Sequence, residues 1–331
     1  MKMIFTFNRA NIITSVRDMG TRGVLGLCLV LCGAALLLSG CNQAPGDTTQ
    51  TSAEEGKLRV VATTTILADV VNQIGGESIQ LDTLLPVGVD PHSFQPSPQD
   101  LSRLAQADVI FVNGARLEEF ILPLIENANP NAPLVEVSEG ITFLAPPASE
   151  SDDEHLEVDP HVWTDPNLVS VWTQNIERAL SDIDPENATI YQDNAEKYRQ
   201  ELTNLDGWIQ EQIALISPEQ RRLVTDHEVL SYFAEHYGFE QTGTILPGVS
   251  TVTEPTAQEL AALIDAIRAQ GVKAVFVGTT VNPTLAMQVV SDTGTRLISI
   301  YTGSLSEADG PASTYLDYMR YNVNAIVEAL K

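Results

Sequence analysis

A strand–helix alternation that occurs twice, with one long helical stretch between, most constrains how this 331-residue chain can fold. Short runs of β-branched and apolar residues alternate with segments of helical period, which predicts parallel sheets covered by helices on both faces. In the first half we expect strands at 59–63, 79–85, 108–113 and 134–137, with helices at 66–74, 98–107 and 117–128. In the second half we expect strands at 222–225, 241–246, 273–277 and 297–301, with helices at 229–237, 256–269, 283–291 and 315–330.

The segment 185–216 separates the two halves, and its apolar residues recur at a helical period on one face. At ~1.5 Å per residue this helix would be roughly 45 Å long, which suits a helix that runs along two lobes. We therefore predict an α/β fold of two lobes, residues 57–184 and 217–331, each with a mostly parallel four-stranded sheet, joined by one long rigid helix. Such sheets bind ligands at the carboxyl ends of their strands, so we expect the ligand in the cleft between the lobes.

The N-terminus predicts an exported protein. Arg17 and Arg22 precede an apolar run, 24–38, that has the length of a signal peptide and is short for a transmembrane helix. The run ends in Leu-Ser-Gly-Cys, a pattern typical of bacterial lipoprotein signals, in which Cys41 becomes the lipid-bearing N-terminus. An uncleaved signal anchor is the alternative.

Two segments follow from this interpretation. We predict a lipoprotein signal peptide at 1–40, with Met19 as an alternative start to Met1. Residues 41–56 lack large apolar side chains and are expected to form a flexible tether between lipid and domain.

The charge of the chain excludes one class of partner. There are 18 basic and 44 acidic residues, for a net charge of −26. Removal of residues 1–40, which hold four basic and one acidic residue, leaves 14 basic and 43 acidic residues and a charge of −29. Such a charge repels nucleic acid and anionic lipid surfaces.

Cys28 and Cys32 are lost with the signal, so Cys41 remains alone and no internal disulfide can form.

Three of the five histidines lie in short, distinctive motifs. They are His92 in Val-Asp-Pro-His-Ser-Phe-Gln-Pro, His161 in Asp-Pro-His-Val-Trp-Thr-Asp-Pro and His227 in Thr-Asp-His-Glu-Val-Leu. Asp-Pro steps before the first two favour extended, rigid backbone. Neutral imidazole is the commonest metal ligand, and the wide spacing favours a site assembled between distant segments over a zinc finger. We predict a metal site from these three side chains; the alternative is ordinary hydrogen-bonded histidines.

The other two histidines are expected to have different roles. His155 lies in an acidic surface loop, 146–160, and should be solvated. His236 lies near a helix end and should be structural.

The chain resembles the zinc- and manganese-binding lipoproteins that serve ABC transporters, the cluster A-I (cluster 9) solute-binding proteins. The resemblance covers Leu58 to Lys331 and rests on the segments 90–100, 159–166 and 227–238 and on a Tyr- and Asn-rich C-terminal helix. It implies two β/α lobes joined by a long rigid helix, and a membrane permease of an ABC transporter as partner. We expect an extracytoplasmic, membrane-anchored monomer.

By this resemblance His92, His161 and His227 fall on the family's first three ligand positions. At the third position, members resembling zinc importers carry histidine and members resembling manganese importers carry glutamate. Nitrogen donors favour Zn²⁺ over Mn²⁺ or Fe²⁺.

The fourth position departs from the family. Gly303, in Tyr-Thr-Gly-Ser-Leu, stands where many relatives carry aspartate. We expect Glu228, Glu307, Asp309 or a water molecule to complete the site. If an aspartate introduced at position 303 can reach the metal, we expect it to tighten binding.

These observations predict high-affinity extracytoplasmic binding of zinc and its delivery to an ABC importer, without catalysis. A manganese- or iron-binding protein of the same class is one alternative. A zinc-dependent hydrolase or hydratase with an open three-histidine site is another. The sequence contains neither a His-Glu-x-x-His motif nor a Gly-x-Ser-x-Gly motif that would support that second alternative.

Overall fold

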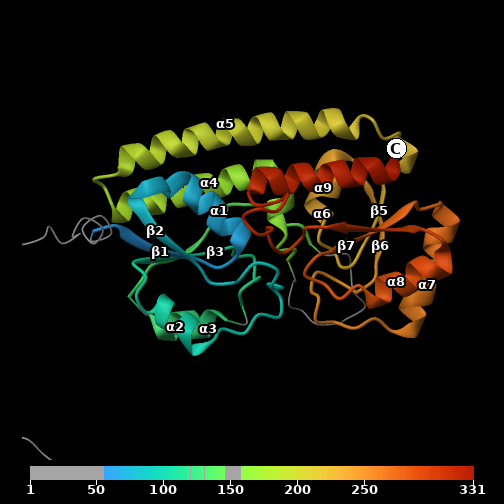
Figure 1. The fold of residues 1–331 in the computed structure, drawn as a ribbon, viewed down its shortest axis with the longest axis horizontal. Helices are drawn as coiled ribbons and strands as arrows, with labels where there is room; N and C mark the ends of the chain where they lie inside the picture. Colours follow the sequence, from blue (N-terminus) through green and yellow to red (C-terminus); the bar gives the residue numbers. More distant parts are fainter. Residues whose placement is uncertain (1–55, 120, 130, 146–157) are drawn as a thin grey trace, which may run out of the picture. The chain divides into compact units, whose positions relative to one another are not determined.

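Two four-stranded sheets with the same strand order form the framework of the protein (Figure 1). The computed structural model describes residues 56–119, 121–129, 131–145 and 158–331. The first sheet has the order β2-β1-β3-β4, with β1 at Leu58–Ala62, β2 at Ile79–Thr83, β3 at Val109–Val112 and β4 at Leu134–Glu136. The second has the order β6-β5-β7-β8, with β5 at Arg222–Thr225, β6 at Glu240–Thr244, β7 at Ala274–Gly278 and β8 at Arg296–Ile300. All paired strands are parallel, which confirms the predicted fold class.

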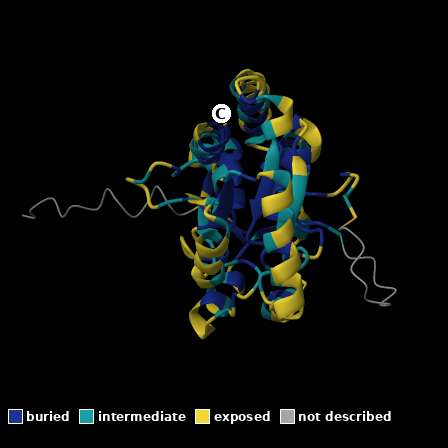
Figure 2. Cartoon of the chain, turned by 90° about the vertical axis from the view of Figure 1, so that its right-hand side faces the viewer, coloured by how far each residue is buried: buried dark blue, intermediate teal, exposed yellow. Residues whose placement is uncertain are grey.

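The central strands explain why these segments form covered sheets. Every residue of β3 (Val-Ile-Phe-Val) and of β7 (Ala-Val-Phe-Val-Gly) is buried. A parallel strand with helices on both faces must be apolar along its whole length, without the alternation of a half-exposed strand. The edge strand β8 is mostly exposed by contrast. Figure 2 shows the buried residues gathered on the sheets and on the inward faces of the helices.

The helices connect the strands and cover the sheets (Figure 1). Their bounds are α1 Thr65–Gly75, α2 Pro98–Leu104, α3 Leu122–Ala128, α4 Pro166–Ile183, α5 Ala188–Ile213, α6 Ser231–Tyr237, α7 Ala257–Gln270, α8 Thr284–Thr293 and α9 Tyr315–Leu330. Short 3₁₀ turns lie at Gly76–Ser78, Val162–Thr164 and Pro218–Gln220. Within the described part of the chain, no helix is both long and apolar enough to cross a membrane.

The 26-residue helix α5, Ala188–Ile213, lies within the segment 185–216 for which a long helix was predicted. Its buried side recurs at a helical period, at Tyr191, Ala195, Tyr198, Leu202, Leu205, Ile209 and Ile213. This side packs against α4 and α1 of the first half and α9 of the second (Figure 1). One continuous hydrophobic cluster contains Val60 and Phe111 from the first sheet and Leu223 and Phe276 from the second. The shared core explains how one helix holds both lobes rigidly.

The helix α4 was not predicted, although its sequence carries the usual marks of a helix. Asp165 caps its start by accepting a hydrogen bond from Asn167 N at 2.9 Å, and Pro166 occupies the first turn. Val169, Trp172, Ile176 and Leu180 form a fully buried stripe at helical spacing. We had expected no helix between the acidic loop 146–160 and residue 185.

The helix expected at 117–128 begins only at Leu122, so that prediction was wrong at its start. Gly114, Ala115 and Arg116 have φ values of 79°, 50° and 66°. Left-handed backbone at three consecutive residues turns the chain sharply just before the predicted helix. The chain continues as turns, with Leu117 N bonded to Gly114 O at 3.1 Å and Glu119 N bonded to Arg116 O at 3.2 Å. This turn lies beside the cleft described below.

The predicted signal peptide 1–40, the lipid-bearing Cys41 and His155 lie outside the described residues, as does the tether 41–56 apart from Gly56. The acidic loop 146–160 is described only from Val158 onward.

Candidate metal centre

The three predicted histidines meet at one point between the two lobes. His92 follows β2, His161 lies in the segment before α4, and His227 follows β5. His161 Nε2 is 3.1 Å from His92 Nε2 and 3.2 Å from His227 Nε2. Among the described residues, these three form the group of metal-ligating atoms that all lie within 4.8 Å of one another.

Two of the imidazoles are oriented by carboxylates at their other ring nitrogen. Asp159 Oδ1 lies 2.7 Å from His161 Nδ1 and also accepts a hydrogen bond from the His161 backbone N–H at 2.9 Å. Asp226 Oδ1 lies 2.5 Å from His227 Nδ1 and accepts from the His227 backbone N–H at 2.7 Å. A neutral imidazole that donates from Nδ1 keeps a lone pair on Nε2. Both rings therefore present Nε2 as an electron-pair donor to the shared point.

His92 is positioned through its backbone. Asp90 Oδ1 accepts from the His92 N–H at 3.0 Å, and Asp90 Oδ2 accepts from the Thr251 hydroxyl at 2.6 Å. Because Thr251 belongs to the second lobe, this pair ties the His92 loop across the cleft. His92 is half-buried, whereas His161 and His227 are 1% and 3% exposed.

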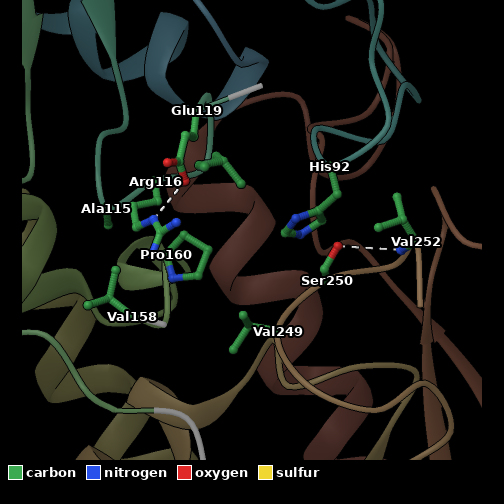
Figure 3. Close-up of a pocket in the computed structure, with 10 residues that line it drawn as sticks. His92, Ala115, Arg116, Glu119, Val158, Pro160, Val249, Ser250 and Val252 are labelled. Carbon is green, nitrogen blue, oxygen red and sulfur yellow. Dashed lines mark hydrogen bonds and ion pairs between the residues drawn. The ribbon is translucent and has the colours of Figure 1, made fainter. Parts of the chain in front are cut away.

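The site lies at the inner end of an open cleft of about 420 Å³ (Figure 3). Ala115, Arg116, Glu119, Val158 and Pro160 form one wall, and Val249, Ser250 and Val252 form the other, with the His92 ring projecting between them. Arg116 and Glu119 form an ion pair of 2.6 Å on the first wall. His92 thus lines both the open cleft and the enclosed space around the three histidines.

Burial keeps two of the imidazoles neutral. It lowers the pKa of His92 well below its ordinary value, and the nearby His161 and His227 rings add to this. Burial also lowers the pKa of His161, although Asp159 opposes the shift. Only the neutral ring can ligate a metal, so near neutral pH a proton does not compete for these two nitrogens.

Of the residues expected to complete the site, none joins the group of three ligand atoms in the described part of the chain. Glu307 and Asp309 are exposed, and Glu228 is half-buried beside His227, with its backbone N–H bonded to Gly248 O at 3.0 Å. Gly303 does line the small enclosed space around the three histidines.

The expectation that an aspartate at position 303 would tighten binding meets a steric obstacle in this structure. A Cβ atom at Gly303 would lie 2.7 Å from Pro91 Cδ. Pro91 is a rigid ring directly before His92, so a side chain at position 303 would displace a candidate ligand.

His236, predicted to be structural, lies between two carboxylates away from the three-histidine group. Its Nδ1 is 2.8 Å from Asp165 Oδ2 and its Nε2 is 3.5 Å from Asp206 Oδ1. These contacts join the start of α4, the middle of α5 and α6, which is a packing role.

The sequence analysis missed Glu118, whose buried carboxyl group accepts hydrogen bonds that stabilise the backbone of one wall of the cleft. Glu118 Oε1 accepts from the Thr63 hydroxyl at 2.7 Å and from Asn113 N at 2.8 Å, and Oε2 accepts from Gly114 N at 3.2 Å. Asn113 Nδ2 in turn donates to Pro160 O, directly before His161. The only hint in the sequence was an acidic residue soon after a buried strand.

Glu118 is expected to make the stability of the protein depend on pH. Burial raises its pKa to about 7, so between about pH 4.5 and 7 the native state holds a proton that the unfolded state has released. The free energy of unfolding therefore falls as pH rises through this window, by up to about 3 kcal/mol from this group. The free energy of unfolding of the wild type minus that of Glu118→Gln, measured by denaturant unfolding, should be larger at pH 5 than at pH 8. An equal difference at both pH values would contradict this.

Comparison with known proteins places the chain in a family. The family model described as zinc-uptake complex component A, periplasmic, matches residues 60–329. The chain is 35% identical to the manganese-binding lipoprotein MntA of Halalkalibacterium halodurans over 297 residues, which cover 89% of this chain and 95% of that protein. It is 31% identical to the manganese ABC transporter substrate-binding lipoprotein PsaA of Streptococcus pneumoniae over 313 residues, covering 92% and 98% of the two chains.

Solved structures agree with this assignment. The periplasmic zinc-binding protein TroA of Treponema pallidum superposes with a TM-score of 0.76 at 28% identity, covering 83% of this chain and 99% of that chain. The manganese-bound periplasmic metal-binding protein of Candidatus Liberibacter asiaticus superposes with a TM-score of 0.73 at 29% identity, covering 83% and 100%.

Fold, site and relatives together define an extracytoplasmic metal-binding protein of the solute-binding class that serves ABC transporters. Within that class the chain belongs to the family of zinc-uptake complex component A. The resemblance and the extracytoplasmic location are thereby confirmed. The relatives are substrate-binding proteins and not enzymes, so the hydrolase or hydratase alternative finds no support.

Proposed function

We propose that the protein captures Zn²⁺ through the Nε2 atoms of His92, His161 and His227 and delivers it to the permease of an ABC importer. The observation that carries this proposal is the convergence of three imidazole nitrogens, two of them set by a carboxylate at Nδ1. Zinc accepts three or four nitrogen ligands in tetrahedral geometry, with water in an open position. The metal is cargo, and we expect the large shared core of the two lobes to form without it.

Manganese is the second candidate, because MntA and PsaA are named for it. Manganese, like magnesium and calcium, suits carboxylate, carbonyl and water oxygens, whereas imidazole suits zinc and iron. The described residues offer three nitrogens and no carboxylate in the common group of ligand atoms. This donor set favours binding of zinc, and we expect manganese or iron to bind at the same site more weakly.

We expect apo protein to bind Zn²⁺ at least roughly tenfold more tightly than Mn²⁺ in a competition titration with a chromogenic chelator. His227→Glu should narrow that ratio, because it replaces one nitrogen donor by the oxygen donor that manganese-type members carry at this position. His236→Glu is the matched control, since His236 lies outside the site, and it should leave the ratio unchanged. A wild-type affinity for Mn²⁺ equal to or above that for Zn²⁺ would overturn the zinc assignment.

We also propose the arrangement that brings the cargo to the permease. Cys41 carries the lipid after removal of residues 1–40, and residues 41–56 tether a monomer to the membrane. The metal-binding unit consists of lobes 57–184 and 217–331 with the linking helix between them. The naming of both curated relatives as lipoproteins supports the anchor.

A further inference from the structure

Two carboxylates are buried directly behind the candidate ligands without a basic partner. Asp159 and Asp226 are 0% and 2% exposed. Among the described residues, the charged or chargeable groups they contact are His161 and His227, and neither pairs with lysine or arginine. Asp159 Oδ2 is buried and has no hydrogen-bond partner in the described part of the chain.

A buried carboxylate without a countercharge is unfavourable, because the protein interior solvates it far less well than water. Each carboxyl group thus lies behind one imidazole ring, on the far side from the point where the three Nε2 atoms converge. A dication at that point would lie one imidazole ring from each carboxylate.

We propose that Asp159 and Asp226 are the charge-balancing residues of the metal centre. Their two negative charges neutralise a bound dication through the imidazole rings, so no carboxylate is needed among the direct ligands. This inference rests on the proposed function, in which the three histidines hold the metal. It explains how Gly303 can stand where relatives carry aspartate while the site still favours a doubly charged ion.

The surroundings of Asp226 hold its charge in place. Asp226 Oδ2 accepts a hydrogen bond from Gly278 N at 2.5 Å. A Cβ at Gly278 would collide with the Thr302 hydroxyl and would lie 3.1 Å from Asp226 Oδ2. The Thr302 carbonyl is itself held by Trp163 Nε1 at 3.0 Å and by the Tyr318 hydroxyl at 3.1 Å. Because Gly278 has no side chain, the Asp226 carboxylate fits between the end of β7 and the His227 ring.

Asp159→Asn is the sharpest test, because it removes the charge and keeps an oxygen that can accept from His161. The new amide nitrogen replaces Oδ2, which has no hydrogen-bond partner to lose. We expect the Zn²⁺ dissociation constant to rise roughly tenfold or more. The melting temperature of the apo protein should stay equal or rise, since a buried charge has been removed. A residue that only supports the fold would lower it.

The control is Asp165→Asn, which removes a buried carboxylate from the same segment but not from behind a ligand. Its Zn²⁺ affinity should stay within about threefold of wild type. Asp226→Asn provides a second test if Asp159→Asn fails to fold, with the same expected weakening. Co²⁺-loaded Asp159→Asn should keep the wild-type visible absorption bands, because the direct ligands are unchanged.

The inference is overturned if both aspartate variants bind Zn²⁺ within threefold of wild type, or if Asp165→Asn weakens binding as much as they do. Failure of the proposed function would differ, since the wild-type protein would then not bind one Zn²⁺ per chain. Strong Zn²⁺ binding by the wild type and both variants would therefore contradict the charge-balancing role and leave the proposed function intact.

Discussion

His161→Ala should weaken Zn²⁺ binding on the order of a thousandfold, about 4 kcal/mol, while the protein remains folded. His161 is the central member of the group, because its Nε2 lies within 3.2 Å of the other two Nε2 atoms. Its loss leaves two ligands and removes the imidazole that contacts the buried Asp159 carboxylate. Two imidazoles in a cleft cannot replace the chelation of three preorganised ones.

Competition titration measures the loss, and circular dichroism of the apo variant checks the fold. His236→Ala is the matched control, since that histidine contacts Asp165 and Asp206 away from the site. It should bind Zn²⁺ as the wild type does. A loss below tenfold for His161→Ala would show that this nitrogen is not a main ligand.

Trp172→Ala is expected to lower the free energy of unfolding by about 4 kcal/mol. Trp172 is fully buried on α4 in the core cluster shared with α1 and α5. Its Nε1 donates to the Ser138 hydroxyl at 3.0 Å, so the substitution leaves both a large cavity and a buried hydroxyl without its partner. Denaturant unfolding of the apo protein measures this change.

Ile190→Ala on α5 is the control for this prediction, because Ile190 is 45% exposed. It should change the free energy of unfolding by less than about 0.5 kcal/mol. The Zn²⁺ affinity of folded Trp172→Ala should match the wild type, since Trp172 does not line the enclosure around the histidines. A change below 1 kcal/mol for Trp172→Ala would mean that α4 packs less tightly than the structure shows.

Local pattern was enough to predict the sheets and most helices. Strands such as β3 and β7 are apolar at every position, and the buried stripe on α5 recurs from Tyr191 to Ile213. These periodicities arise from the geometry of the chain itself and need no knowledge of its partners. The helix α4 was missed although Asp165, Pro166 and its apolar stripe were visible, because the preceding motif was treated as part of a loop.

The left-handed turn at Gly114, Ala115 and Arg116 could not be predicted in this way. Alanine and arginine rarely adopt left-handed backbone, so their residue types give no sign of this turn. The buried Glu118 accepts the N–H groups of Asn113 and Gly114 and holds this turn. Contacts of this kind depend on which segments fold against each other.

The sequence by itself determined the two β/α halves, the long helix between them, and three histidines in rigid motifs at strand ends. Those features follow from periodicity and from residue type. Only the tertiary structure decided that Pro91 occupies the space beside Gly303, and that Asp226 faces both His227 and Gly278 N. Both results depend on close packing of residues far apart in the chain, for which one sequence carries no local pattern.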